Sequence, residues 1–194
     1  MRADELQRVE DVTANFFFWQ GLRWAALGVA LVAGIVVAEQ FAATRESRVL
    51  VLVASVALGF GMSAGAGRYY ARAYGRVRAL PELATRRERL KWNVVYPLMF
   101  VSLIIDAMWK GPVLLSGPIW AGAIVAYRNS TGRGRVHYLF IAPVVAATLF
   151  LPLFIEPGRA TVNLFFALVG ATYAIGGILD HLELRRILRP VVED

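Results

Sequence analysis

The sequence contains no cysteine, so disulfide bonds, thiolate metal sites and cysteine nucleophiles are excluded. Its two histidines, His137 and His181, argue against a multi-histidine metal site. Walker loops and HExxH helices do not occur either. The sequence therefore shows no catalytic signature and predicts no cofactor or bound metal.

Charge is also scarce, because only 18% of the 194 residues are charged while 58% are hydrophobic. Soluble domains carry about 25% charged residues. The net charge of +7 is compatible with nucleic acid, but no soluble segment remains to bind a duplex. Lysine and arginine also accumulate in the cytoplasmic loops of membrane proteins. We therefore expect a membrane protein with no nucleic-acid partner.

Long hydrophobic runs dominate the chain. A helix needs about 20 mostly apolar residues to cross the hydrocarbon core of a bilayer. Six stretches approach this length, and they predict an all-α, polytopic transmembrane bundle in a single membrane domain, 1–194. The six stretches are 22–41, 49–67, 92–109, 112–127, 136–154 and 161–179. The fourth is the shortest, with Pro112 and Pro118 near its start.

The distribution of basic residues predicts the orientation. Six spans place 17 of the 21 lysines and arginines on the side of the two termini, and 4 on the other side. Basic residues concentrate on the cytoplasmic side of membrane proteins. We therefore expect both termini in the cytoplasm, and a multi-pass protein of the inner (plasma) membrane.

The segment before the first span has a different pattern. Leu6, Val9, Val12, Phe16 and Trp19 recur at spacings of three and four residues, so they share one helical face. The aromatic cluster at 16–19 suits the headgroup level. Residues 3–19 are predicted to form an amphipathic interfacial helix on the cytoplasmic face. The alternative is a simple extension of the first span.

Small residues occur at spacings that suit close helix packing. In lipid, such residues let two helix backbones approach each other. The alternative is that they line a substrate path. The predicted packing positions are Gly61, Gly65, Gly117, Gly170, Gly176 and Gly177.

The segment 68–91 is a basic cytoplasmic loop in this interpretation. Arg68, Arg72 and Arg76 recur every four residues, and a predicted helix at 82–91 carries further arginines. Arginines beside a membrane attract anionic lipid headgroups. A phosphorylated ligand or a cytoplasmic protein is the alternative partner. The second group of arginines is Arg86, Arg87 and Arg89.

Two acidic residues, Asp106 and Glu39, lie near the outer ends of their predicted spans. An ionisable group in a span raises the hypothesis of a functional site, here one for a proton or a cation. Asp106 also stands four residues before Lys110, which would allow a local ion pair.

The inner end of the sixth stretch carries Asp180, His181 and Glu183, and His137 begins the fifth stretch at the same predicted depth. An imidazole beside carboxylates can relay protons or ligate a metal. The alternative is a polar helix end, followed by Arg185 and Arg186. These four acidic and histidine residues form the candidate polar site.

Residues 12–24 (VTANFFFWQGLRW) and 176–181 (GGILDH) resemble segments of small, uncharacterised bacterial polytopic membrane proteins. The resemblance runs through most of the chain. It implies a bacterial inner-membrane location and no known activity.

Three functions remain open at this point. Six spans with an amphipathic amino-terminal helix resemble the permease half of some ABC exporters, whose loops dock on an ATPase. This resemblance favours a transport-associated or permease-like component with an ATPase partner. The alternatives are a membrane scaffold or regulatory subunit that forms a homo-oligomer, and a lipid-modifying enzyme acting at the cytoplasmic headgroup level.

Overall fold

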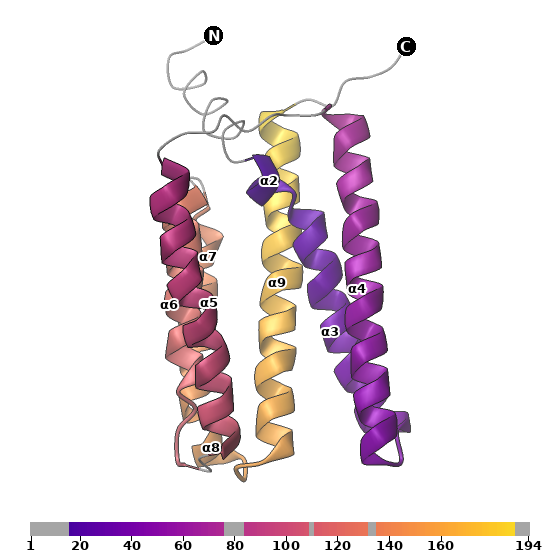
Figure 1. Cartoon of the computed structure of the whole chain (residues 1–194), viewed down its shortest axis with the longest axis vertical. Coiled ribbons are helices and arrows are strands. Elements are labelled where there is room, and N and C mark those ends of the chain that lie inside the picture. The colour runs from indigo at the N-terminus through magenta and orange to yellow at the C-terminus, as the bar shows by residue number, and fades with distance from the viewer. Residues whose placement is uncertain (1–15, 76–83, 109–110, 132–134, 189–194) are drawn as a thin grey trace. The chain divides into compact units, whose positions relative to one another are not determined.

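The computed structural model describes residues 16–75, 84–108, 111–131 and 135–188 (Figure 1). The described residues form helices and turns, and no strand. The elements are α2 (Phe16–Trp19), α3 (Gly21–Phe41), α4 (Arg45–Ala73), α5 (Ala84–Met108), α6 (Ser116–Thr131), α7 (His137–Ala147), the 3₁₀ helix η1 (Thr148–Phe150), α8 (Leu151–Phe154) and α9 (Arg159–Ile187).

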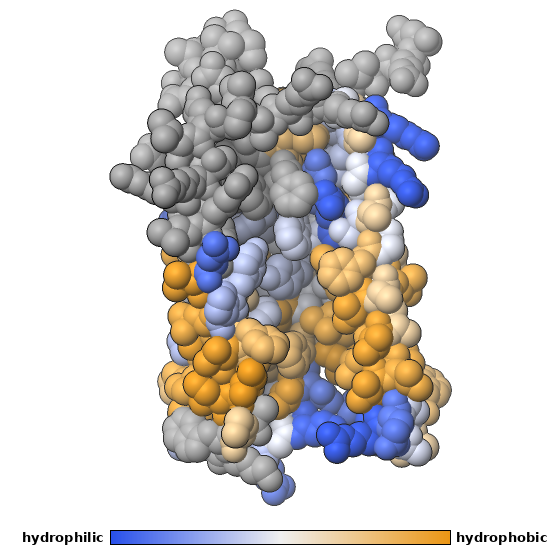
Figure 2. Space-filling model, viewed as in Figure 1, coloured by the Kyte–Doolittle hydropathy of each residue, from blue (hydrophilic) through white to orange (hydrophobic). Residues whose placement is uncertain are grey.

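Four helical stretches are long and apolar enough to cross a membrane: α3, α4, the run His137–Phe154 and α9. Hydrophobic side chains cover the middle of the described helices in Figure 2, and hydrophilic ones gather toward their ends. The prediction of an all-helical fold is thus confirmed for the described residues, and the four apolar helices agree with a membrane protein. The apolar part of α5, Asn93–Asp106, is shorter, and α6 has 16 residues. Six spans therefore remain a prediction.

The interfacial helix predicted at 3–19 falls mostly on residues 3–15, which lie outside the described residues. Its last residues form α2. The chain divides into two compact units, one built from residues 1–79 with 169–194 and the other from residues 80–168. Since each unit is described by itself, the single membrane domain stays a prediction.

In the first unit, α4 is longer at both ends than the predicted stretch 49–67. The Thr44 side chain accepts a hydrogen bond from Ser47 N–H, and the Ser47 hydroxyl accepts one from Thr44 N–H, so a capping box starts the helix at Arg45. At the other end the helix continues to Ala73, and Gly75 follows with a φ of +76°. Glycine adopts this left-handed conformation readily and ends helices. Residues 68–73 therefore belong to a helix rather than to a loop.

Two glycine pairs bring α3 and α9 into close contact. A methyl group on Gly21 or Gly177 would clash with the backbone carbonyl of the other residue. Two helical turns along, Gly28 faces Gly170 in the same way. The two glycines on each helix are seven residues apart, and the pairing runs antiparallel. Without side chains at these four positions, the two backbones lie against each other, which is how helices associate in lipid.

The second unit is organised around a break in the helix that follows α6. Pro152 has no N–H to donate to a preceding carbonyl. Just before it, the backbone tightens from an α-helix into the 3₁₀ helix η1. The carbonyl of Leu149 instead accepts a hydrogen bond from Leu114 N–H, at 3.1 Å, in the segment before α6. Gly117 packs against this break, where a methyl group would lie 2.6 Å from Thr148 Oγ1. The start of α6 therefore packs against this break.

We predict that Gly177→Ala lowers the free energy of unfolding by about 1–3 kcal/mol, because the added methyl group overpacks the α3–α9 contact. Gly122→Ala is the matched control, since a methyl group there meets no atom of the described chain within 4 Å. Alanine favours a helix over glycine, so the control is expected to keep or raise stability. Denaturation by SDS in mixed micelles measures both. Equal losses in the two variants would contradict the prediction.

Candidate functional site

Three helices of the first unit meet at the hydroxyl of Tyr70, a fully buried residue of α4. Leu22 N–H, in the first turn of α3, donates a hydrogen bond to this oxygen at 3.1 Å. The oxygen also lies 2.9 Å from Nδ1 of His181, on α9. The tautomer of His181 sets the direction of this bond, because Tyr70 can donate to a bare Nδ1 or accept from Nδ1–H. We call this arrangement the Tyr70 tie.

The Tyr70 tie satisfies a backbone group that α3 cannot satisfy itself. The first N–H groups of any helix have no acceptor within it. Gln20, which precedes α3, makes no side-chain cap, although its carbonyl accepts from Arg23 N–H. The hydroxyl of Tyr70 supplies the acceptor for Leu22 from another helix.

Aromatic rings surround the tie. Phe16 of α2 meets the ring of Tyr70 edge-on at 6.4 Å, and Tyr74 stacks on it at 6.0 Å. Trp19 and Leu184 complete this buried cluster. Burial raises the pKa of the Tyr74 hydroxyl, just past the end of α4, above its ordinary value. The cluster attaches α2 to the ends of α4 and α9.

Asp180, the second member of the candidate polar site, is fully buried. It lies against Gly21, the first residue of α3, where an added methyl group would meet its Cβ at 2.8 Å. His181 approaches Leu22, in the same first turn, through Tyr70. Asp180 and His181 thus both lie at the start of α3, a location that their own segment does not predict.

The remaining members of the candidate polar site are Glu183 and His137. Glu183 is half-buried on α9, and His137 begins α7 in the second unit. The predicted approach of His137 to His181 stays a prediction. The described residues contain no group of three or more His, Asp or Glu side chains that could hold a metal ion.

Asp106 has a structural role in the second unit. Its Oδ1 accepts a hydrogen bond from Leu115 N–H and its Oδ2 one from Ser116 N–H, each at 2.8 Å. A carboxylate from the end of α5 thus caps the start of α6. The suggested partner Lys110 lies outside the described residues, and Glu39 is an exposed residue of the first unit.

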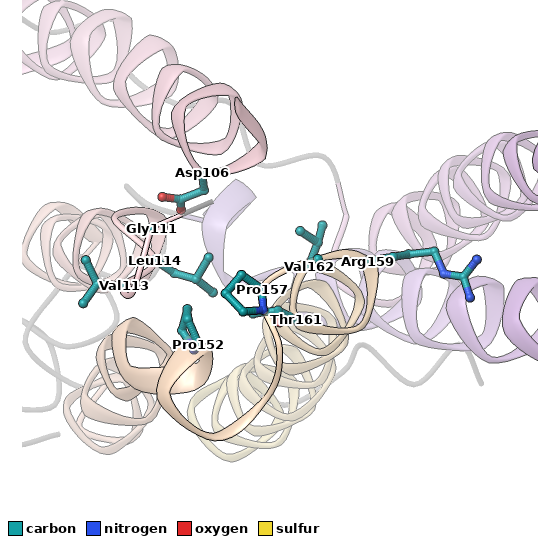
Figure 3. A pocket seen from close by; sticks show the side chains of 10 residues that line it. Asp106, Gly111, Val113, Leu114, Pro152, Pro157, Arg159, Thr161 and Val162 are labelled. Carbon is teal, nitrogen blue, oxygen red and sulfur yellow. The ribbon is translucent and has the colours of Figure 1, made fainter. Parts of the chain in front are cut away.

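Asp106 also borders a cavity of about 330 Å³ in the second unit (Figure 3). Most of the wall is apolar, and the polar lining side chains are Asp106, Arg159 and Thr161. The Thr161 hydroxyl is engaged, because it donates to the carbonyl of Glu156 at 2.9 Å.

The predicted lipid-binding arginines are partly described. Arg68 and Arg72 are exposed on the last two turns of α4. Arg76 lies outside the described residues, and the segment 86–89 belongs to α5 with its side chains undescribed. Binding of anionic headgroups stays a prediction.

The glycines predicted to pack helices divide into two groups. Gly117, Gly170 and Gly177 lie against neighbouring backbone or side chains, and Gly176 is buried. At Gly61 and Gly65, in contrast, a methyl group would meet no atom of the described chain within 4 Å. Sequence reasoning missed Gly21 and Gly28, although their seven-residue spacing matches that of 170 and 177.

Comparison with known protein families, with curated proteins and with solved structures finds no match for this chain. The function of this chain is therefore inferred from the geometry of the described residues.

We predict that Tyr70→Phe lowers the free energy of unfolding by about 1–3 kcal/mol, because it leaves the partly buried Leu22 N–H without its acceptor. Tyr69→Phe is the matched control, since the neighbouring tyrosine is 41% exposed. Chemical denaturation in detergent measures both variants. A loss in Tyr69→Phe as large as that in Tyr70→Phe would argue against the tie.

Proposed function

We propose that this chain is a membrane scaffold subunit that pairs with a second copy of itself through α4. The supporting observation is a stripe of small residues on α4 that no other described part of the chain covers. Ala54, Ala57 and Gly61 follow one another at spacings of three and four residues, Ala64 and Gly65 continue the same face, and all five are exposed. We call this set the α4 stripe.

The contrast with the rest of the first unit supports pairing. Glycines at four positions let α3 and α9 pack backbone to backbone: Gly21, Gly28, Gly170 and Gly177. Glycine destabilises a helix by about 1 kcal/mol relative to alanine unless a contact compensates. Of the four membrane-spanning candidates, α4 is also the least buried, at 11% of its apolar window. A partner helix on the α4 stripe would supply the missing contact.

Symmetry favours a second copy as that partner. Two copies inserted in the same direction are related by an axis along the membrane normal, so their α4 helices run parallel. A surface of small residues is complementary to itself, as in membrane dimers with glycines four residues apart. Such a pair also brings the arginines at the end of α4, Arg68 and Arg72, to one level. There, anionic headgroups would neutralise their charge.

We predict that Gly61→Leu weakens self-association at least about tenfold, because the larger side chain keeps the two backbones apart. Gly122→Leu is the matched control, since Gly122 is an equally open glycine on α6, away from the α4 stripe. Single-molecule photobleaching in liposomes measures the dimer fraction at several protein densities. A monomeric wild-type chain, or equal loss in both variants, would refute the proposal.

We further propose six spans with both termini in the cytoplasm of a bacterial cell. All six predicted stretches overlap described helices, and the 17-to-4 division of basic residues supports the orientation. In a five-span alternative α6 would not cross, and every later segment would change sides.

The absence of cysteine makes this topology testable by single-cysteine labelling with a membrane-impermeant maleimide. We predict that Glu156→Cys is labelled from outside and Asn129→Cys only after the membrane is opened. Ala43→Cys and Ala73→Cys serve as outside and inside references. External labelling at 129 together with protection at 156 would reject six spans.

The other two functions receive less support. The transport-associated interpretation depends on an ATPase that docks at the arginines 86, 87 and 89, whose side chains are not described. The lipid-modifying interpretation needs His181 as a reactive group, yet its Nδ1 is engaged by Tyr70. Both interpretations stay predictions.

A further inference from the structure

The geometry points to the cavity of the second unit as a binding site for a small, protonated amine with an apolar body, held by the carboxylate of Asp106. The cavity measures about 330 Å³, near the lower end of the range for small-molecule sites. It lies between the end of α5, the segment before α6 and the turn from α8 into α9.

The walls set the apolar part of the ligand. Val113, Leu114, Pro152, Pro157 and Val162 contribute most of the side chains around the cavity (Figure 3). These side chains offer neither donors nor acceptors, so they suit an aromatic or aliphatic body.

The polar groups set its charge. An ionised carboxylate has about four acceptor positions, and the N–H groups of Leu115 and Ser116 occupy two of those of Asp106. No donor among the described residues fills the other two positions, which are open to the N–H groups of an ammonium. Such a charge-assisted hydrogen bond is stronger than a neutral one. An anion would be repelled by the carboxylate.

The basic residue at the edge of the cavity does not cancel this preference. Arg159 is exposed, and Figure 3 shows its guanidinium extending away from the other lining side chains. The hydroxyl of Thr161 already donates to Glu156. Asp106 is therefore the polar group on the cavity wall that selects the ligand.

Fluorine NMR of the full chain in detergent micelles tests the inference with two probes of equal size, 4-fluorobenzylammonium and 4-fluorobenzyl alcohol. The ammonium is expected to bind saturably and at least about tenfold more tightly than the alcohol, which lacks the charge. Micelles without protein give the background of partitioning. Equal binding of the two probes, or no saturable binding of the ammonium, would overturn the inference.

Three variants distinguish loss of the binding site from loss of the fold. Val162→Phe fills the cavity and is expected to reduce ammonium binding at least tenfold, while Val144→Phe, at a 53% exposed position on α7, leaves it unchanged. Asp106→Asn is expected to abolish the preference for the ammonium, but it also disturbs the cap of α6. If that variant does not fold, the two valine variants decide alone. Unchanged binding in Val162→Phe would overturn the inference.

Discussion

The first backbone N–H groups of a helix have no acceptor within it, and the hydrocarbon of a bilayer supplies no water to replace that acceptor. At the start of α3 and of α6, acceptors come from other helices. The hydroxyl of Tyr70 on α4 serves α3, and the carboxylate of Asp106 on α5 serves α6. Each of these hydrogen bonds can form only when the two helices that it joins are neighbours. Satisfying the backbone therefore selects the helix neighbours within each unit.

The glycine contacts and the Tyr70 tie depend on the same geometry. His181 follows Gly177 by four residues, so the two share one face of α9. When Gly177 lies against Gly21, that face brings Asp180 and His181 to the first turn of α3, where Leu22 needs an acceptor. A side chain at Gly21 or Gly177 would separate the helices and open the tie as well. The close approach of α3 and α9 and the hydrogen bond to Leu22 N–H thus stabilise each other.

Sequence reasoning located the helices well, because hydropathy depends on residues that are neighbours along the chain. It also identified as candidates Asp106, His181 and three glycines that lie against neighbouring atoms, Gly117, Gly170 and Gly177. What it missed involves residues distant in sequence. Tyr70 and His181 are separated by 111 residues, and Asp106 caps a helix that begins ten residues later. Pairing Gly21 with Gly177 requires knowing which helices are neighbours, which a pattern on one helix does not contain.

The caps also bear on what this chain does. A side chain that holds the start of a helix cannot readily transfer a proton, because a change in its hydrogen bonds releases the backbone group it satisfies. Tyr70 and Asp106 are in this position, and His181 is held by Tyr70. Of the residues that resemble a catalytic set in the sequence, His181 is thus occupied by the fold. The α4 stripe and the remaining acceptor positions of Asp106 are not occupied in this way, and both suit recognition rather than reaction. Binding of a second helix and of a small cation therefore agrees better with the architecture than catalysis.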